Sequence, residues 1–307
     1  MNRKYKLLII GGSGFLSGTL ASIAVMQGHE VYIVTRGQKP VPEGVTALVA
    51  DRHDEAAFKK VIADADCHWD AVFDCICFDP EEARQDIEEF KNRTDHLIWV
   101  STDFVYAPGK RWFPQTEQNM NFLMDDSYGA KKRLCELEFI NGNLGEMVYT
   151  VLRPAHIYGP GSYPGCLPQE TRNPSLISKI KEGQPLFLVG GGYFLQQPIF
   201  AADLAELMLS CIGNEKTYNE IFCAMGPDII ESRKYYEIIG EYLGKDAVIE
   251  EIPVNQYLSE HPDAGPFMCH RLYDLGKLKN AGVKVPSTSI RDGLYKHIES
   301  MAKHNRL

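Results

Sequence analysis

The 307-residue sequence lacks an excess of positive charge and lacks long basic runs. Lysine and arginine together number 32 against 41 aspartates and glutamates, so the formal net charge is −9. The longest basic run is Lys131-Lys132-Arg133. A protein whose main partner is nucleic acid usually carries a basic face that displaces counterions from the phosphates. The charge therefore argues against nucleic acid as a partner, with a local basic patch as the open alternative.

Long apolar runs are also missing from the sequence. The first run, Leu7–Ile10, is far shorter than a signal-peptide core or than the roughly 20 residues of a membrane-spanning helix. No later run reaches spanning length. We therefore expect a cytoplasmic protein with no membrane partner.

Clustered metal ligands are scarce. The eight cysteines are scattered along the chain, and the closest pair, Cys75 and Cys77, has no second pair and no group of histidines beside it. A structural zinc site takes four grouped ligands, whereas an isolated free cysteine packs as a small hydrophobic residue. We expect no metal site, and buried thiols in a reducing compartment.

The sequence does contain short apolar runs that alternate with helical patterns. Leu16, Leu20 and Ile23, for example, recur at helical spacing within residues 14–27. A second helix is expected over residues 80–90. Strands and helices that alternate in this way are typical of a parallel sheet with right-handed crossovers. The expected strands are Leu7–Ile10, Glu30–Thr35, Val45–Ala50, Ala71–Ile76, His96–Ser101 and Met147–Leu152.

After Arg153 the alternation loosens, and residues 154–175 are rich in the proline, glycine and tyrosine that are typical of loops. Further on, the patterns predict four helices and one strand: Ala201–Ile212, Ser232–Leu243, Leu275–Ala281 and Ile290–Ala302, with the strand at Ala247–Ile252. We predict an α/β fold, a Rossmann-type doubly wound parallel sheet with a small interleaved C-terminal substrate lobe. The dinucleotide-binding domain is expected to comprise residues 1–153 plus about 184–224, and the substrate-binding lobe residues 154–183 plus 225–307.

A glycine-rich segment follows the first expected strand and opens the first helix. It reads Gly11-Gly12-Ser13-Gly14-Phe15-Leu16-Ser17-Gly18. Glycines let the main chain approach a pyrophosphate closely, and the helix directs its N-terminal N–H groups and positive dipole end at the phosphates. The alternative is a tight turn that binds nothing. The candidate cofactor-binding residues here are Gly11, Ser13, Gly14, Phe15 and Leu16.

The end of the second expected strand bears on the choice of cofactor. NAD-binding domains usually place Asp or Glu there, on the ribose 2′-OH, but this sequence has Thr35 followed by Arg36. With no carboxylate to repel a 2′-phosphate, Arg36 can bind that phosphate or stack on the adenine. We therefore favour NADP(H), with NAD(H) as the alternative. Arg36 could also be no more than a solvated residue at the end of a strand.

Three residues suggest proton transfer. Thr102 lies at the end of the strand His96–Ser101, where chemistry gathers in parallel sheets. Tyr128 and Lys132 are four residues apart, so they share one face of a helix. A phenol has a reference pKa of about 10, which a nearby ammonium would lower to give a general acid or base. The alternative is an accidental pairing on an exposed helix.

Seven segments in order carry a resemblance to a known family: GGSGFLS, LVADRHD, VSTDFVY, SYGAKK, LRPAHIYGPG, PIFAADLAE and RLYDLGKL. Over nearly its whole length the chain resembles the extended short-chain dehydrogenase/reductase superfamily, in its NAD-dependent epimerase/dehydratase family. The resemblance implies an oxidoreductase, or an epimerase and thus an isomerase, that acts on a sugar-like hydroxyl or carbonyl. It makes Tyr128 the acid/base, places Lys132 on the nicotinamide ribose and has Thr102 hydrogen-bond the reacting oxygen.

The resemblance also implies further contacts and a possible homodimer, because many relatives dimerise through the helix that carries the tyrosine and lysine. Beyond the glycine segment, the expected cofactor contacts are Thr35, Arg36, Asp51, Arg52, Cys75, Ile76, Cys77, Pro154, His156 and Ile157. The expected substrate contacts are Asp103, His156, Gln196 and Arg271.

Four residues depart from the family pattern. Ser17 replaces the third glycine of the glycine-rich segment. Phe104 stands where nucleotide-sugar dehydratases have an acidic residue, which argues against 4,6-dehydratase activity. Gln196 replaces an arginine that binds the substrate diphosphate in many members, which argues against a nucleotide-diphosphate sugar. His156 replaces an asparagine and could contact substrate, although a structural role is the favoured interpretation.

The stretch FDCICFDPEEA and the residues Thr35-Arg36-Gly37 resemble a divergent subgroup of the family. That subgroup includes chloroplast stem-loop RNA-binding proteins, which have lost the catalytic tyrosine. Tyr128 and Lys132 are both present here, which favours an enzyme. A non-catalytic protein that binds a dinucleotide or RNA is the alternative.

Overall fold

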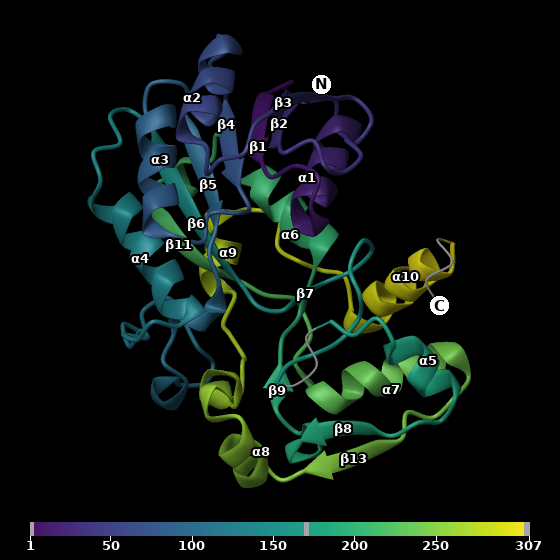
Figure 1. Cartoon of the computed structure of the whole chain (residues 1–307). Coiled ribbons are helices and arrows are strands. Elements are labelled where there is room, and N and C mark those ends of the chain that lie inside the picture. The colour runs from purple at the N-terminus through teal and green to yellow at the C-terminus, as the bar shows by residue number, and fades with distance from the viewer. Residues whose placement is uncertain (1–2, 169–171, 304–307) are drawn as a thin grey trace.

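A seven-stranded parallel sheet forms the centre of the computed structural model, which describes residues 3–168 and 172–303 (Figure 1). The strand order is β11-β6-β5-β4-β1-β2-β3. The strands are β1 Lys6–Ile10, β2 Glu30–Thr35, β3 Val45–Val49, β4 Ala71–Asp74, β5 His96–Val100, β6 Val148–Pro154 and β11 Glu220–Ala224.

Helices cover both faces of this sheet, because successive strand residues point to opposite sides. Leu7 and Ile9 of β1 pack in a core with α1, α6 and α9, whereas Leu8 and Ile10 pack in a core with α2, α3 and α4. Figure 1 shows α2, α3 and α4 on one side of the strands and α1 and α6 on the other. These helices are α1 Phe15–Met26, α2 Glu55–Asp64, α3 Pro80–Phe90, α4 Tyr128–Asn141, α6 Ala201–Ser210 and α9 Gly276–Ala281.

The predicted Rossmann-type sheet is confirmed: β2 has the expected bounds, and the ends of the other expected strands differ by no more than two residues. Two elements of this layered part had no counterpart among the expected elements. Helix α2 begins after Asp54, whose side chain caps it by accepting a hydrogen bond from the Ala57 N–H. Strand β11 forms the edge of the sheet by pairing with β6, about 70 residues earlier in the chain.

The described residues that follow β6 also form a smaller lobe, which holds three two-stranded sheets. They pair β7 Ile157–Tyr158 with β10 Ile199–Phe200, β9 Leu195–Gln196 with β12 Ile230–Glu231, and β8 Leu186–Val189 with β13 Ile249–Ile252. The helices α5 Leu176–Lys181, α7 Ser232–Leu243, α8 Val254–Glu260 and α10 Ile290–Lys303 belong to this region. The exact division into two domains stays a prediction. The strand pairing does place β11 in the large sheet and β8 beside β13.

The strand order reverses at β1, since the chain moves to β2 on one side and returns to β4 on the other. In open α/β sheets, ligands bind in the crevice that such a reversal opens at the carboxyl ends of the strands. The glycine-rich segment follows β1 and Cys75–Cys77 follow β4, so both lie at this crevice. None of the helices in the described part of the chain is long and apolar enough to span a membrane.

Candidate functional site

The glycine-rich turn after β1 packs tightly against the neighbouring strands. Gly11 has a φ of +102°, and a Cβ there would lie 2.9 Å from Cγ2 of Ile76. A Cβ at Gly12 would lie 2.2 Å from Cγ2 of Ile33. Both positions therefore require glycine, one for its backbone conformation and both for the close approach. The turn is held to β2 because the Gly11 N–H donates to the Val34 carbonyl oxygen at 2.9 Å.

Ser17 fits into this turn without disturbing it. Its side chain is buried, and its Oγ accepts a hydrogen bond from the Gly14 N–H at 3.1 Å. The hydroxyl thus satisfies one of the free N–H groups at the start of α1. The next amides, those of Phe15 and Leu16, are the first two of the helix and have no partner one turn earlier. The serine therefore leaves a helix N-terminus with donors that can bind an anion.

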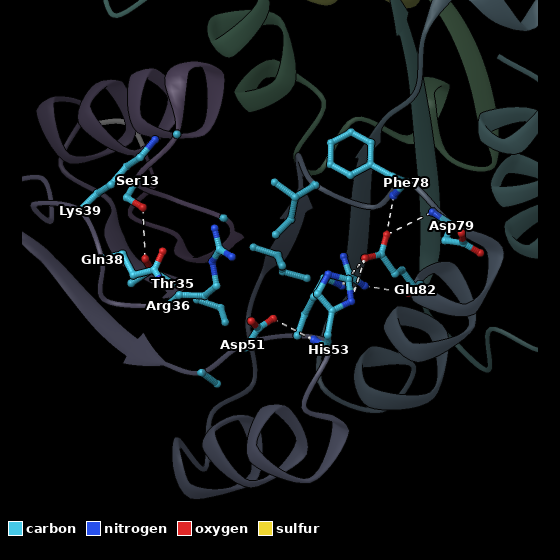
Figure 2. Close-up of a pocket in the computed structure, with 17 residues that line it drawn as sticks. Ser13, Thr35, Arg36, Gln38, Lys39, Asp51, His53, Phe78, Asp79 and Glu82 are labelled. Atoms are coloured by element: carbon cyan, nitrogen blue, oxygen red, sulfur yellow. Dashed lines mark hydrogen bonds and ion pairs between the residues drawn. The ribbon is translucent and has the colours of Figure 1, made fainter. Parts of the chain in front are cut away.

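A cavity of about 460 Å³ opens beside the turn, at the carboxyl ends of β1, β2 and β4 (Figure 2). Eight of the expected cofactor residues line it: Gly11, Ser13, Gly14, Thr35, Arg36, Asp51, Arg52 and Ile76. Residues of the wall that sequence analysis missed include Gln38, Lys39, His53, Phe78, Asp79 and Glu82. Gln38 and Lys39 continue the segment that begins with Thr35 and Arg36, so a signal for them was present in the sequence.

The remaining expected cofactor residues do not line this cavity. Phe15 lines a second, more open cavity of about 700 Å³, which shares Ser13, Gly14 and Lys39 with the first. Pro154 ends β6 and His156 and Ile157 follow it, on the stretch that leads from the large sheet into the lobe. Leu16, Cys75, Cys77, Pro154, His156 and Ile157 line neither of the two cavities.

Arg52 reaches the wall of the cavity, but its guanidinium is engaged by buried carboxylates. Its Nη1 lies 2.6 Å from Asp74 and its Nη2 lies 3.0 Å from Asp86, and all three side chains are buried. Burial acts to raise the pKa of Asp74, but the Arg52 charge together with hydrogen bonds to the carboxylate holds that pKa below its usual value. Burial and the Asp74 charge raise the pKa of Asp86 well above its usual value. Arg52 therefore joins β4 and α3 to the segment after β3.

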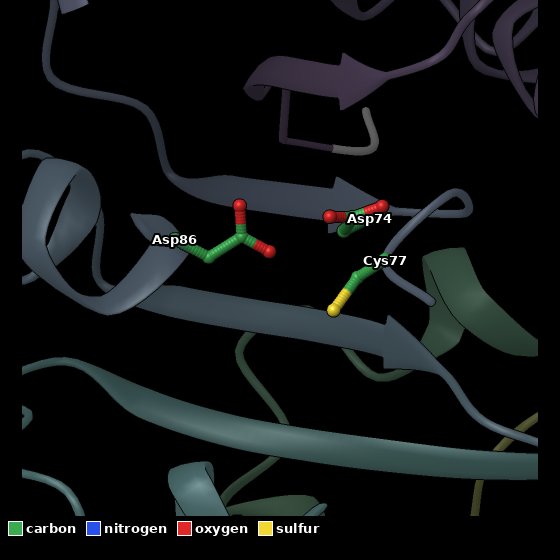
Figure 3. Close-up of side chains that lie close together, drawn as sticks. All are labelled: Asp74, Cys77 and Asp86. Carbon is green, nitrogen blue, oxygen red and sulfur yellow. The ribbon is translucent and has the colours of Figure 1, made fainter. Parts of the chain in front are cut away.

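Asp74, Cys77 and Asp86 point toward one another in this buried cluster (Figure 3). Their potential ligand atoms lie within 4.8 Å of one another, which is the spacing of a metal site. Arg52 already supplies a positive charge to both carboxylates there. Burial raises the pKa of the Cys77 thiol well above its usual value, which disfavours the thiolate that binds metals.

Tyr128 and Thr102 meet where α4 begins. The Ser127 Oγ caps the helix by accepting from the Ala130 N–H at 3.4 Å. A Cβ on Gly129 would lie 2.0 Å from the Phe104 carbonyl oxygen, so a glycine lets the helix start close to the segment after β5. About half of the Tyr128 surface is exposed (49%), yet burial around the phenol raises its pKa to about 12. The nearby Thr102 hydroxyl acts in the opposite direction and lowers that pKa.

Lys132 lies one turn further along α4 and is fully buried. Its Nζ donates to the carbonyl oxygens of Cys77 at 2.6 Å and Val100 at 2.7 Å. Burial lowers the pKa of its ammonium. The ammonium is thus bound at the carboxyl ends of β4 and β5, beside the crevice. The expected lowering of the Tyr128 pKa by this ammonium is not seen, because burial raises that pKa and the ammonium is directed at the Cys77 and Val100 carbonyl oxygens.

Asp103 and Arg271, both expected to contact substrate, are bonded to each other. The Arg271 Nη1 lies 2.6 Å from the Asp103 carboxylate, which also accepts from the Tyr273 hydroxyl at 2.7 Å. Both Asp103 and Arg271 are 1% exposed. The Arg271 guanidinium also lies 3.9 Å from the centre of the Phe104 ring. The pair therefore holds the segment after Thr102 against the C-terminal part of the chain.

The other two expected substrate contacts are neutral. Gln196 is buried, and its Nε2 has no hydrogen-bond partner within the described residues. Burial, aided by the charge of Arg172, lowers the pKa of His156 to about 4, so its imidazole is uncharged at neutral pH. The Tyr128 ring lies beside two phenylalanine rings. The centres of the Phe104 and Phe78 rings are 6.3 and 6.5 Å from the centre of the Tyr128 ring.

Comparison with known proteins agrees with this architecture. Residues 7–222 match the NAD dependent epimerase/dehydratase family. The chloroplast stem-loop binding protein of 41 kDa b from Arabidopsis thaliana is 28% identical over 239 residues, which cover 72% of this chain and 58% of that protein. A UDP-N-acetyl-alpha-D-glucosaminuronate decarboxylase from Bacillus cytotoxicus is 22% identical over 96% of this chain and 97% of its own length.

Solved structures show the same fold at low identity. UDP-glucose 4-epimerase from Thermotoga maritima, solved with UDP-glucose, superimposes with a TM-score of 0.77 at 19% identity. The superposition covers 98% of this chain and 99% of the epimerase. Other solved proteins with this fold are complexes with NAD. At this identity the likeness establishes the arrangement of the chain, and the chemistry depends on the residues described above.

Proposed function

This chain belongs to the NAD dependent epimerase/dehydratase family, and from that premise we propose that it is an NADP(H)-dependent reductase or epimerase. Its substrate would carry a sugar-like hydroxyl or carbonyl. One observation carries the proposal: Thr102 and Tyr128 meet at the carboxyl end of β5, with Lys132 bound at the ends of β4 and β5. This group lies at the side of the sheet where the glycine-rich turn also opens.

The residues of the crevice fit a dinucleotide. The close approach of Gly11 to Ile76 leaves no room for a larger residue, and the first amides of α1 are free to donate. In this proposal the amides of Phe15 and Leu16 hold the pyrophosphate and Asp51 lies near the adenine. When bound, the nicotinamide ring supplies the hydride acceptor or donor.

The proton chemistry belongs to Tyr128. Its phenol would give a proton to a substrate carbonyl oxygen, or take one from a hydroxyl, while Thr102 holds that oxygen by a hydrogen bond. Lys132 would hold the crevice in shape by its bonds to the Cys77 and Val100 carbonyl oxygens. Solved relatives bind UDP-sugars. In this chain the neutral Gln196 and the buried pair Asp103–Arg271 favour a sugar-like substrate without a diphosphate.

Two measurements test the proposal. Native mass spectrometry of the protein as purified detects a bound dinucleotide, and titration with NADPH and NADH, followed by nucleotide fluorescence, gives the dissociation constants. We expect a bound dinucleotide or a dissociation constant in the micromolar range for at least one of the two. Absence of binding at millimolar concentrations of both would contradict the proposal.

The second candidate is a non-catalytic protein that binds RNA, which the 28% identity to the chloroplast stem-loop binding protein favours. Filter binding with a structured RNA over a range of salt concentrations separates the two. An RNA-binding protein would bind tightly and lose affinity steeply with salt, because counterion release drives such binding. We expect weak binding, since the net charge is −9.

Arg36→Ala should weaken NADP⁺ binding by about 10- to 100-fold, the worth of a charge-assisted hydrogen bond to a phosphate. Arg36 lines the cavity and has no carboxylate partner within the described residues, and Lys39 lines the same wall (Figure 2). Calorimetric titration measures the effect. NAD⁺, which lacks the 2′-phosphate, serves as the control ligand and should lose no more than a few-fold. Equal losses for both ligands would show that Arg36 stacks on the adenine, and the preference for NADP⁺ would be wrong.

A further inference from the structure

Arginines without an ion pair are rare in this protein and are therefore informative. Within residues 3–168 and 172–303, every arginine except Arg36, Arg93 and Arg172 pairs with a carboxylate. Arg36 lines the cofactor cavity. Arg93 lies before β5, at the opposite end of the sheet from the crevice. Arg172 belongs to the lobe, and its surroundings differ from those of Arg36 and Arg93.

The Arg172 side chain lies on the glycine-rich turn. Its guanidinium carbon is 5.2 Å from the centre of the Phe15 ring, and Phe15 is the first residue of α1. The loop before Arg172 approaches the same ring, since a Cβ on Gly161 would lie 3.4 Å from Phe15 Cδ2. The main chain next to Arg172 is fixed, because the Asn173 N–H donates to the Pro164 carbonyl oxygen at 2.9 Å. The lobe thus brings a cation to the start of α1.

Among the described residues, no carboxylate forms an ion pair with Arg172. Partial burial lowers the pKa of Arg172, and among the described residues the Tyr235 phenol acts to raise it. The positive charge of Arg172 helps to lower the pKa of His156, so the adjacent histidine is uncharged and does not compete for an anion. The Phe15 ring favours a guanidinium over its face by a cation–π contact. The exposed Arg172 guanidinium therefore lies beside the Phe15 ring with no carboxylate partner among the described residues.

We propose that Arg172 binds the diphosphate group of the dinucleotide from the side of the lobe, opposite the free amides at the start of α1. The assignment rests on the proposed function, because it requires a dinucleotide in the crevice. A diphosphate carries two negative charges, more than one helix N-terminus balances, and a guanidinium matches phosphate oxygens in geometry and charge. The lobe would then contribute directly to cofactor binding, and the two arginines Arg36 and Arg172 would bind two different phosphate groups of one ligand.

Two ligand fragments separate the two arginines. ADP contains the diphosphate without a 2′-phosphate, and 2′-AMP contains the 2′-phosphate without the diphosphate. Arg172→Ala should weaken ADP and NADP⁺ binding by about tenfold and leave 2′-AMP binding within about twofold. Arg36→Ala should give the reverse for the two fragments. Arg172→Lys, which keeps the charge, should recover part of the affinity for ADP.

Arg93→Ala is the matched control, since it also removes an arginine without a carboxylate partner, and it should change none of the dissociation constants. Equilibrium dialysis or calorimetry measures the constants, and thermal unfolding verifies that each variant is folded. UDP distinguishes the other possible source of a diphosphate, the substrate. A loss for UDP with unchanged ADP binding would overturn the proposal and assign Arg172 to the substrate.

Unchanged ADP and NADP⁺ binding in Arg172→Ala would also overturn the proposal, while the proposed function would stand because the dinucleotide still binds. If the unaltered protein binds neither ADP nor NADP⁺, both the role of Arg172 and the proposed function fail.

Discussion

Tyr128→Phe should reduce turnover by about 100- to 10,000-fold and leave dinucleotide affinity unchanged, because a general acid/base contributes rate enhancement of that order. The change removes one hydroxyl and keeps the ring, which lies 6.3 Å from Phe104 and 6.5 Å from Phe78 between ring centres. Steady-state rates with a panel of free and UDP-linked sugars measure turnover. Fluorescence titration with NADPH measures cofactor binding.

Tyr242→Phe is the control for that experiment, since Tyr242 lies on α7 in the lobe and packs against Tyr295. It removes the same hydroxyl at a distance from the crevice and should leave turnover unchanged. A Tyr128→Phe variant that keeps full turnover would contradict the proposed role of the phenol. A variant that loses cofactor affinity as well would mean that Tyr128 supports the crevice rather than the proton transfer.

The two directions of the reaction should depend on pH differently. The pKa of Tyr128 is raised to about 12 by burial, so the phenol is protonated at every pH between about 6 and 9. Reduction uses the protonated phenol as an acid and should be nearly independent of pH in this range. Oxidation uses the phenolate, whose fraction rises by about tenfold per pH unit, and its rate should still be rising at the upper end. An oxidation rate that levels off near pH 7 would show that the bound ligands lower this pKa by several units.

Local sequence patterns predicted the elements whose own residues determine them. The apolar run of β1, the glycine turn and the helical spacing of α1 each involve residues close together in the chain, so their structure follows from sequence alone. Strand β11 was missed because its place in the sheet depends on pairing with β6. A pairing between segments so far apart leaves no mark on the five residues of β11 themselves.

The site was predictable for residue identity but less so for side-chain direction. The spacing of Tyr128 and Lys132 correctly placed both on one helix, α4. The hydrogen-bond partners of the Lys132 ammonium are the carbonyl oxygens of Cys77 and Val100. These two oxygens come together only in the folded sheet, so the sequence could not predict them. Asp103 and Arg271 are 168 residues apart in the chain. Their charges suggested contacts with substrate, but in the folded protein the two side chains bind each other.

Arg153→Met should destabilise the protein by about 3–5 kcal/mol, the usual effect of removing one partner of a buried ion pair. Arg153 on β6 donates from Nε and Nη2 to the two carboxylate oxygens of Glu136 on α4, at 2.8 and 2.7 Å. Both side chains are buried. The same carboxylate accepts from Ser101, the residue before Thr102, at 2.7 Å. Urea unfolding followed by circular dichroism measures the change.

Arg84→Met is a matched control, because Arg84 also pairs with a glutamate of α4, Glu138, at 2.9 Å, but its side chain is 51% exposed. An exposed pair contributes less than about 1 kcal/mol, so this variant should unfold close to the unaltered protein. A second variant, Arg153→Met combined with Glu136→Leu, removes both members of the buried pair and should recover part of the lost stability, since Arg133, 12% exposed, is then the charge that loses its carboxylate partner. Equal stability of Arg153→Met and Arg84→Met would mean that the bond between β6 and α4 does not hold the helix carrying Tyr128 in place.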